Sequence, residues 1–214
     1  MTGPSTSVVI EEGTITPLTG SCFCKSLRYK LHPQRREDCT LTAYCHCSKC
    51  QILNGAPYVW TTHWVEGALT WIDGSSSSSS SSSPGISAVS TSDDTEPLLP
   101  NKPDLPKSLQ TYNTMPGRKW KIRCRVCGTP MGSWSQAKLE WTIWPTSLDR
   151  PTTTVEKIAD DGKKVTVTEV GSVKEITHWF RPTSHQFYGD WRAVDVQDDL
   201  PRFLGYPGKS EQVA

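Results

Sequence analysis

The chain has 214 residues and a formal net charge of +1, from 23 Lys and Arg against 22 Asp and Glu. This balance argues against a surface that wraps nucleic acid, because such surfaces are strongly basic. The first residues lack the basic and apolar regions of a signal peptide, and no apolar run approaches the ~20 residues that span a bilayer. We therefore expect a cytoplasmic protein without a membrane partner. A nuclear location is also compatible, and the oligomeric state is open.

Short β-prone segments follow one another along the chain, with a short turn after Cys50 as the candidate for helix. Leu27, Tyr29 and Leu31 alternate with basic residues, as in a strand with one buried face. The predicted strands are Gly20–Leu31, Leu41–Tyr44, Pro57–Thr62, Ala68–Ile72, Ser108–Thr114, Lys119–Arg123, Met131–Ser135, Glu140–Trp144, Val155–Ile158 and Val165–Val170. Asp160-Asp161-Gly162 predicts a hairpin turn between the last two. The sequence therefore predicts a mostly β fold.

A low-complexity segment interrupts this pattern. Ser75–Ser83 is an unbroken Ser run, and the sequence stays rich in Pro, Asp, Thr and Ser up to Lys107. Such a composition buries too little apolar surface to offset the entropy of ordering. We predict a disordered insertion over 74–107, between two strands of one sheet, and a flexible N-terminus over 1–18. A phosphorylated regulatory loop is the functional alternative for the insertion.

Seven of the eight cysteines fall into three clusters with the spacing of metal ligands. The clusters are Cys22-x-Cys24, Cys45-x-Cys47-x-x-Cys50 and Cys124-x-x-Cys127. Clustered thiols in a reducing compartment are typical of metal sites rather than of disulfides. A closed structural zinc site uses four protein ligands, while a catalytic site uses three and leaves a position open. The count of seven therefore indicates one zinc that stabilises the fold and one with an open position for an external ligand.

The third cluster, followed by Gly128, has the form of a zinc knuckle, in which glycine permits a positive φ. Cys22 and Cys24 lie two residues apart, would share one face of a strand, and so form a matching pair. A thioredoxin-type redox motif is the rival interpretation of the knuckle, but that motif belongs beside a βαβ pattern. Spacing alone does not decide which clusters share a metal.

The middle cluster can deliver three thiolates to one metal, with Cys50 returning after a tight turn. His46 lies within it and should point the other way, which favours a packed imidazole over a ligand. Zinc with three thiolates is a weak Lewis acid, but it can bind an external thiol as its fourth ligand. The bound thiol would be ionised and could attack an aldehyde. This chemistry favours thiol adducts over hydrolysis. Cys39 stands outside the clusters and is expected to be a lone buried thiol.

Three segments resemble the cysteine motifs of the glutathione-dependent formaldehyde-activating enzyme family, which also contains centromere protein V. They are GSCFCKSLRY (20–29), YCHCSKCQILNGA (44–56) and RCRVCGTPM (123–131). WPTSLDRP (144–151) and HQFYGDWRAVDVQDDLPRFLGYP (185–207) resemble two later segments of the family. The cysteine motifs in that order are specific, whereas each alone would be weak.

The resemblance implies a tent-like fold of antiparallel sheets with two zinc ions per chain. It implies one zinc-binding domain over 19–207, with a second insertion over 152–180 and a flexible C-terminus over 208–214. The structural zinc would be held by Cys22, Cys24, Cys124 and Cys127. The catalytic zinc, with a position for water or glutathione sulfur, would be held by Cys45, Cys47 and Cys50. Active family members join glutathione and formaldehyde, which is a carbon–sulfur lyase reaction in reverse.

Residues outside the metal ligands depart from the family pattern. Gln51-Ile52 follows the middle motif where the family often has Arg, and Leu148-Asp149 lacks its preceding Gly. These departures leave the substrate open. Candidates to receive glutathione carboxylates, with a solvated surface as the alternative, are Lys49, Arg118, Lys119 and Arg123.

Three further residues are candidates for the site. Trp144 and Trp191 are candidates to line a pocket, and core packing is the alternative for both. His185 could support the open metal site, and a structural hydrogen bond is the alternative.

The leading expectation is a zinc-dependent carbon–sulfur lyase or synthase that acts on a glutathione-type thiol adduct of an aldehyde or related electrophile. The alternative is a non-catalytic zinc-binding module that binds a small molecule or a protein partner. Iron in place of zinc is a further alternative, because a knuckle pair can also hold iron.

Overall fold

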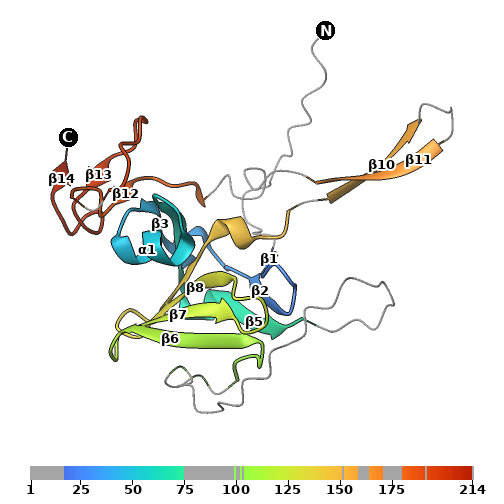
Figure 1. Ribbon diagram of the computed structural model, residues 1–214, viewed down its shortest axis with the longest axis horizontal. Helices are drawn as coiled ribbons and strands as arrows, with labels where there is room; N and C mark the ends of the chain where they lie inside the picture. The colour runs from blue at the N-terminus through green and yellow to red at the C-terminus, as the bar shows by residue number, and fades with distance from the viewer. Residues whose placement is uncertain are drawn as a thin grey trace, which may run out of the picture.

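The computed structural model describes residues 17–74, 99, 102, 104–150, 152–158, 164–170, 180–190 and 192–213, with only the backbone at 152–157 and 165–170. The fold is mostly β, as predicted (Figure 1). The strands are β1 Leu18–Ser21, β2 Leu27–Leu31, β3 Cys39–Cys45, β4 Val59–Val65, β5 Leu69–Asp73, β6 Leu109–Met115, β7 Lys119–Cys124, β8 Pro130–Ser135, β9 Glu140–Ile143, β10 Thr152–Ile158, β11 Lys164–Val170, β12 His185–Gln186, β13 Arg202–Phe203 and β14 Gln212–Val213. The helical elements are α1 Ser48–Asn54 and the 3-10 turns Arg36–Asp38, Glu66–Ala68 and Pro145–Ser147.

The described strands form three sheets. The largest has nine strands in the order β14-β13-β12-β3-β4-β9-β8-β7-β6, and a second has the order β1-β2-β5. β10 and β11 pair only with each other, and they form the antiparallel hairpin predicted around Asp160-Asp161-Gly162, although that turn itself lies outside the described residues. The large sheet is mixed rather than purely antiparallel, because β12 runs parallel to both β3 and β13.

The hydrophobic core lies between the three-stranded sheet and one face of the nine-stranded sheet. β2 follows the predicted alternation, since Leu27, Tyr29 and Leu31 are buried and the basic residues between them are exposed. Across the interface, the rings of Trp71 and Trp141 meet edge to face with centroids 6.0 Å apart. Large aromatic side chains thus supply much of the buried area that holds the two sheets together.

The other face of the nine-stranded sheet carries a buried row of polar residues. Lys121 of β7 pairs with Ser133 of β8, Ser133 pairs with Thr142 of β9, and Thr142 pairs with His63 of β4. All four are at most 5% exposed. Gly132 permits the close approach of β8 and β9, because a Cβ there would lie 2.2 Å from the backbone oxygen of Thr142. This polar row forms one wall of the candidate site.

Two predicted elements around the cysteines differ in detail from the structure. Gly20–Leu31 is not one strand, because the chain turns between β1 and β2, where Lys25 has a φ of 66°. The helical turn predicted after Cys50 is present but begins earlier, since α1 runs from Ser48 to Asn54 and contains Cys50. In both places the chain bends at a cysteine cluster, which a regular strand could not do.

The ends of the predicted flexible segments contribute to the fold. Leu99, inside the predicted insertion, is 2% exposed in the core, and the ammonium of Lys102 lies 4.6 Å from the centre of the Trp134 ring and pairs with Glu66. In the predicted flexible C-terminus, Gln212–Val213 forms β14 and pairs with β13. The Ser run and the other residues of 75–98, together with residues 100, 101 and 103, lie outside the described residues. Among the described helices, none has the length and apolar character required to cross a membrane.

Candidate metal centres and their cavity

Four of the predicted ligands come together where the turn after β1 meets the turn after β7. This four-thiol cluster consists of Cys22, Cys24, Cys124 and Cys127, whose sulfur atoms all lie within 4.8 Å of one another. The Sγ atoms of Cys22 and Cys24 are 3.5 Å apart, and those of Cys24 and Cys124 are 3.8 Å apart. A tetrahedral zinc ion with bonds of about 2.3 Å would place its sulfur ligands about 3.8 Å apart. The donor set therefore fits a closed metal site.

Two tight turns build the four-thiol cluster. In the second turn the amide of Gly128 donates to the carbonyl of Cys124 at 2.9 Å, and Gly128 has the predicted positive φ, 72°. Burial raises the pKa of Cys127, but hydrogen bonds from Thr129 outweigh it and lower the pKa to about 6. The first turn brings Cys22 and Cys24 together, so their proximity comes from a bend and not from a shared strand face.

The other three predicted ligands meet at the junction of β3 and α1. This three-thiol cluster consists of Cys45 at the end of β3, Cys47 just before α1 and Cys50 in its first turn, with all sulfur atoms within 4.8 Å. The amide of Cys50 donates to the carbonyl of Cys47 at 3.0 Å, which turns both side chains to one side. Three soft donors at this spacing fit the ligand set of an open metal site.

The sulfur atoms of the three-thiol cluster contact one another and a nearby cation. The thiol of Cys45 donates a hydrogen bond to the sulfur of Cys47 at 3.5 Å, and this bond, together with one from Cys50, lowers the pKa of Cys47 to about 2. The same contact raises the pKa of Cys45. The ammonium of Lys121 lies 3.9 Å from the sulfur of Cys50. The cluster therefore has a buried cation beside its sulfur atoms.

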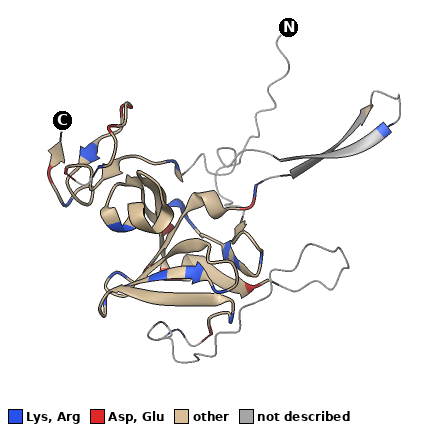
Figure 2. Ribbon diagram, viewed as in Figure 1, with Lys and Arg blue, Asp and Glu red and all other residues tan. Residues whose placement is uncertain are grey.

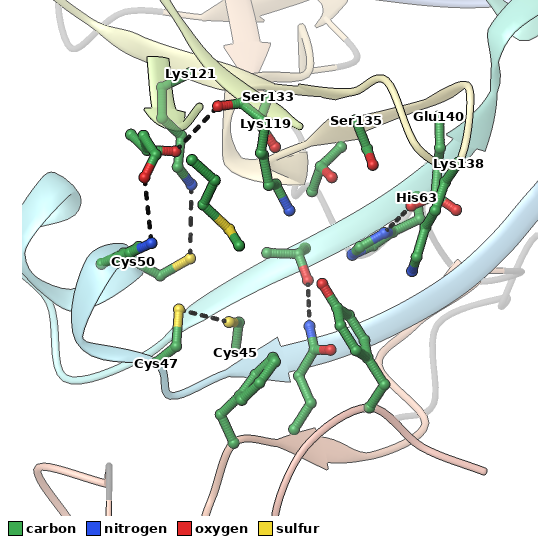
Figure 3. A pocket seen from close by; sticks show the side chains of 18 of the residues that line it. Cys45, Cys47, Cys50, His63, Lys119, Lys121, Ser133, Ser135, Lys138 and Glu140 are labelled. Atoms are coloured by element: carbon green, nitrogen blue, oxygen red, sulfur yellow. Dashed lines mark hydrogen bonds and ion pairs between the residues drawn. The ribbon is translucent and has the colours of Figure 1, made fainter. Parts of the chain in front are cut away.

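A cavity of about 580 Å³ opens from the three-thiol cluster. Figure 3 shows the sulfur atoms at one end, and His63, Lys138 and Glu140 at the other. Its described lining holds one carboxylate, Glu140, and five cationic side chains. The cationic side chains are Lys49, Arg118, Lys119, Lys121 and Lys138. Figure 2 shows basic positions on both α1 and β7, and the cavity therefore suits an anionic ligand.

The carboxylate in the lining is already paired. Oε1 of Glu140 lies 2.5 Å from Nδ1 of His63, and the hydroxyl of Thr40 donates to Oε2 at 2.9 Å. Burial lowers the pKa of His63 more than Glu140 raises it. The one carboxylate of the described lining is thus engaged by His63 and Thr40.

Several buried polar atoms of the lining have no hydrogen-bond partner among the described residues. They are Oγ of Ser133, Oγ1 of Thr142, Nε1 of Trp144 and Oε1 of Gln186. Buried polar groups normally find partners, so each of these atoms is a place where a ligand could bond.

The two histidines near the three-thiol cluster have structural contacts. Nε2 of His46 lies 2.8 Å from Nδ1 of His185, whose Nε2 lies 2.9 Å from a carboxylate oxygen of Asp198. Burial lowers the pKa of His46 to about 4. The prediction of a packed imidazole for His46 is confirmed, and His185 makes the structural hydrogen bond that was its alternative role. The chain of rings anchors β12 beside β3.

The remaining candidates fall in different places. Trp144 and three of the predicted basic residues line the cavity, whereas Arg123 donates to Gln110 at 2.6 Å on an exposed surface. Trp191 lies outside the described residues. Cys39 is a half-buried thiol outside both clusters, and burial raises its pKa to about 12.

Sequence reasoning missed the polar row, Lys121, Ser133, Thr142 and His63. These residues alternate with buried apolar ones, and that pattern ordinarily marks a solvated strand face. The signal that could have identified them is that they lie opposite one another on neighbouring strands. Recognising this requires knowledge of the register of the sheet. The polar row is therefore a feature that only the fold reveals.

Comparison with known proteins bears on the first part of the chain. Residues 17–92 match the family model for the glutathione-dependent formaldehyde-activating enzyme. The match includes the first two cysteine motifs and ends before the third. A crystal structure of a Rhodobacter sphaeroides protein is similar at 13% identity, with a TM-score of 0.39, over 62% of this chain and 88% of that chain. No curated protein matches this chain.

Proposed function

We propose that the protein is a carbon–sulfur lyase, because residues 17–92 match the family model for the glutathione-dependent formaldehyde-activating enzyme. It joins the sulfur of a glutathione-type thiol to the carbonyl carbon of an aldehyde, and it cleaves the same adduct in reverse. The observation that carries the proposal is the three-thiol cluster at one end of a cationic cavity.

We propose that both clusters hold zinc, the four-thiol cluster as a structural site and the three-thiol cluster as a catalytic one. Cys45, Cys47 and Cys50 would hold the catalytic zinc, which would supply a position where an external thiol is ionised at neutral pH. In the four-thiol cluster the protein fills every position, so that site stabilises the fold.

The side chains of the cavity bind and orient the thiol. Lys119 is half-buried on the wall, while Arg118 and Lys138 are exposed at the mouth, where they can bind the carboxylates of a peptide thiol. Trp144 and Phe187 add apolar surface that limits the access of water to the sulfur end. Holding both reactants at one place lowers the entropic barrier to their addition.

Adduct formation from formaldehyde and glutathione, followed by NMR with the zinc-loaded protein, tests the proposal. The wild-type protein should accelerate formation and cleavage of S-hydroxymethylglutathione or of the adduct of another aldehyde. The Cys50→Ser variant should lose this acceleration. The Cys39→Ser variant is the matched control, because Cys39 is a thiol outside both clusters, and it should keep the acceleration. Equal rates with and without wild-type protein, for several aldehydes, would refute the enzyme.

A cobalt-substituted protein distinguishes the enzyme from a metal-binding scaffold. Glutathione should change the visible spectrum of the cobalt protein, because its sulfur enters the open position of one site. A spectrum that does not respond to glutathione supports the scaffold instead.

A further inference from the structure

A group of buried hydrogen-bond donors lies beside the three-thiol cluster. This donor group consists of Lys121, Ser133, Thr142 and Trp144, all at most 5% exposed and all lining the cavity. The first three are neighbours across the strands β7, β8 and β9, where paired residues have Cβ atoms about 5 Å apart. Figure 3 shows Lys121 extending toward Cys50.

The donor group is not satisfied by the described part of the protein. Oγ of Ser133, Oγ1 of Thr142 and Nε1 of Trp144 have no partner there. The indole N–H can only donate, and an ammonium has three donors, of which Lys121 directs one to Cys50. Balancing the charge of the sulfur atoms would explain Lys121 alone. The unpaired hydroxyls and the indole can all donate to one acceptor with several lone pairs, and a carboxylate is such an acceptor.

The position of the donor group limits which carboxylate can reach it. If the sulfur of glutathione occupies the three-thiol cluster, its own carboxylates lie beyond at least one peptide bond and extend toward Arg118 and Lys138. The carbon that the sulfur attacks lies next to the sulfur. A carboxylate attached directly to that carbon would therefore lie beside Lys121 and Cys50, where the donor group is.

We propose that Lys121, Ser133, Thr142 and Trp144 form a carboxylate subsite that selects an aldehyde bearing a carboxylate on its carbonyl carbon. The inference rests on the proposed function and names its electrophile. In the reaction the S–H bond of the thiol adds across the C=O bond. The sulfur–carbon bond forms, the π pair moves to oxygen, and the oxygen takes the proton, so no oxidant or reductant is required. The carboxylate stays bound to the donor group throughout.

Two aldehydes of similar size provide the test with the zinc-loaded full chain. Glyoxylate carries the carboxylate, and glycolaldehyde carries a neutral hydroxymethyl group in its place. With glutathione as the thiol, we expect KM for glyoxylate to be at least tenfold lower than KM for glycolaldehyde. Calorimetry with glutathione and each aldehyde gives equilibrium binding as a second readout. Equal KM values and equal affinities for the two aldehydes would overturn the subsite.

Hydroxyl-removing variants show whether the donor group causes the preference for glyoxylate over glycolaldehyde. Ser133→Ala should reduce the ratio of the two affinities about tenfold, because it removes one hydrogen bond to a charged group. Thr142→Val should act similarly. Ser184→Ala is the matched control, because Ser184 is also buried with an unpaired hydroxyl but does not line the cavity, and it should leave the ratio unchanged. Equal effects of Ser133→Ala and Ser184→Ala would contradict the subsite.

The ethyl diester of glutathione separates the two sources of a carboxylate. If the subsite takes the carboxylate of the aldehyde, the preference for glyoxylate persists with the diester. If Ser133→Ala weakens binding of glutathione but not of its diester, the subsite belongs to the thiol and the proposal is wrong. Turnover of formaldehyde without any preference for glyoxylate rejects the subsite and keeps the lyase. Absence of turnover with every aldehyde, together with a silent cobalt spectrum, rejects the lyase itself.

Discussion

At the scale of single residues, the two cysteine clusters differ in what surrounds their sulfur atoms. In the four-thiol cluster the sulfur neighbours are other cysteines, backbone amides and hydroxyls such as that of Thr129. In the three-thiol cluster they include the ammonium of Lys121 and a cavity. The first arrangement suits a closed metal site, while the second has room and positive charge for a ligand.

Substitution of one cysteine in each cluster should separate stability from binding. Cys124→Ser should lower Tm by about 10 °C, because the four-thiol cluster connects the turn of the small sheet to β7 of the large sheet. Cys50→Ser should lower Tm less and abolish the response of the cobalt spectrum to glutathione. Calorimetry and spectroscopy on both variants check this. Equal decreases in Tm for the two variants would contradict the assignment of one cluster as structural and the other as a binding site.

The His63–Glu140 pair makes stability depend on pH. Burial lowers the pKa of His63 below its ordinary 6.5, so the unfolded chain binds this proton more readily than the folded chain. The pKa of Glu140 is also below its ordinary 4.5, because hydrogen bonds from His63 and Thr40 outweigh the effect of burial. Both groups therefore contribute stability that is lost as pH falls, His63 below about 6.5 and Glu140 below about 4.5.

Urea unfolding of wild type and His63→Gln between pH 8 and pH 5 tests this dependence. The wild-type free energy of unfolding should fall more steeply below pH 6.5 than that of the variant, which has no imidazole to protonate. Parallel curves would mean that His63 titrates alike in the folded and unfolded chain. The comparison isolates His63 because both proteins keep every cysteine.

At the scale of elements, β8 and β9 determine the geometry of the cavity wall. Their register places Ser133 beside Thr142 on the polar face and Trp134 beside Trp141 in the core. The absence of a side chain at Gly132 lets the two strands pack closely at this point. A disturbance here should therefore affect both the core and the polar row.

Gly132→Ala should destabilise the protein by about 3 kcal/mol, since the added Cβ would meet the backbone oxygen of Thr142 at 2.2 Å. Gly67→Ala is the matched control, because a Cβ at Gly67 meets nothing within 4 Å, and it should change stability by less than about 0.5 kcal/mol. Urea unfolding measures both. Similar values for the two variants would contradict the tight packing of β8 on β9.

Local patterns in the sequence predicted most of the strands and the hairpin. The grouping of the cysteines into a set of four and a set of three was implied by the family resemblance, because spacing alone did not decide it. Local patterns failed where the chain bends, as at Cys22–Cys24, because a turn between two short strands has no periodicity of its own. They also failed for the polar row, because alternation does not tell whether the polar face of a sheet meets water or a buried cavity. Leu99 was missed because two adjacent leucines in a low-complexity segment give no periodic pattern.

At the scale of the whole molecule, distant parts of the chain converge on the two clusters. The four-thiol cluster joins residues about 100 positions apart and connects the two main sheets. Strand β12, in the C-terminal part of the chain, lies beside β3, where Gln186 pairs with Cys45 at the rim of the cavity. The fold thus surrounds one cluster with turns and places the other at the end of a cationic cavity.

The metal content of the purified protein, measured by elemental analysis together with titration of free thiols, tests the central claim most directly. We predict two equivalents of zinc per chain, with Cys39 as the one thiol that stays free of metal. The Cys45→Ser, Cys47→Ser, Cys50→Ser triple variant should retain one equivalent. One equivalent or fewer in the wild-type protein would contradict the account, because the three-thiol cluster would then hold no metal and offer no position for a thiol.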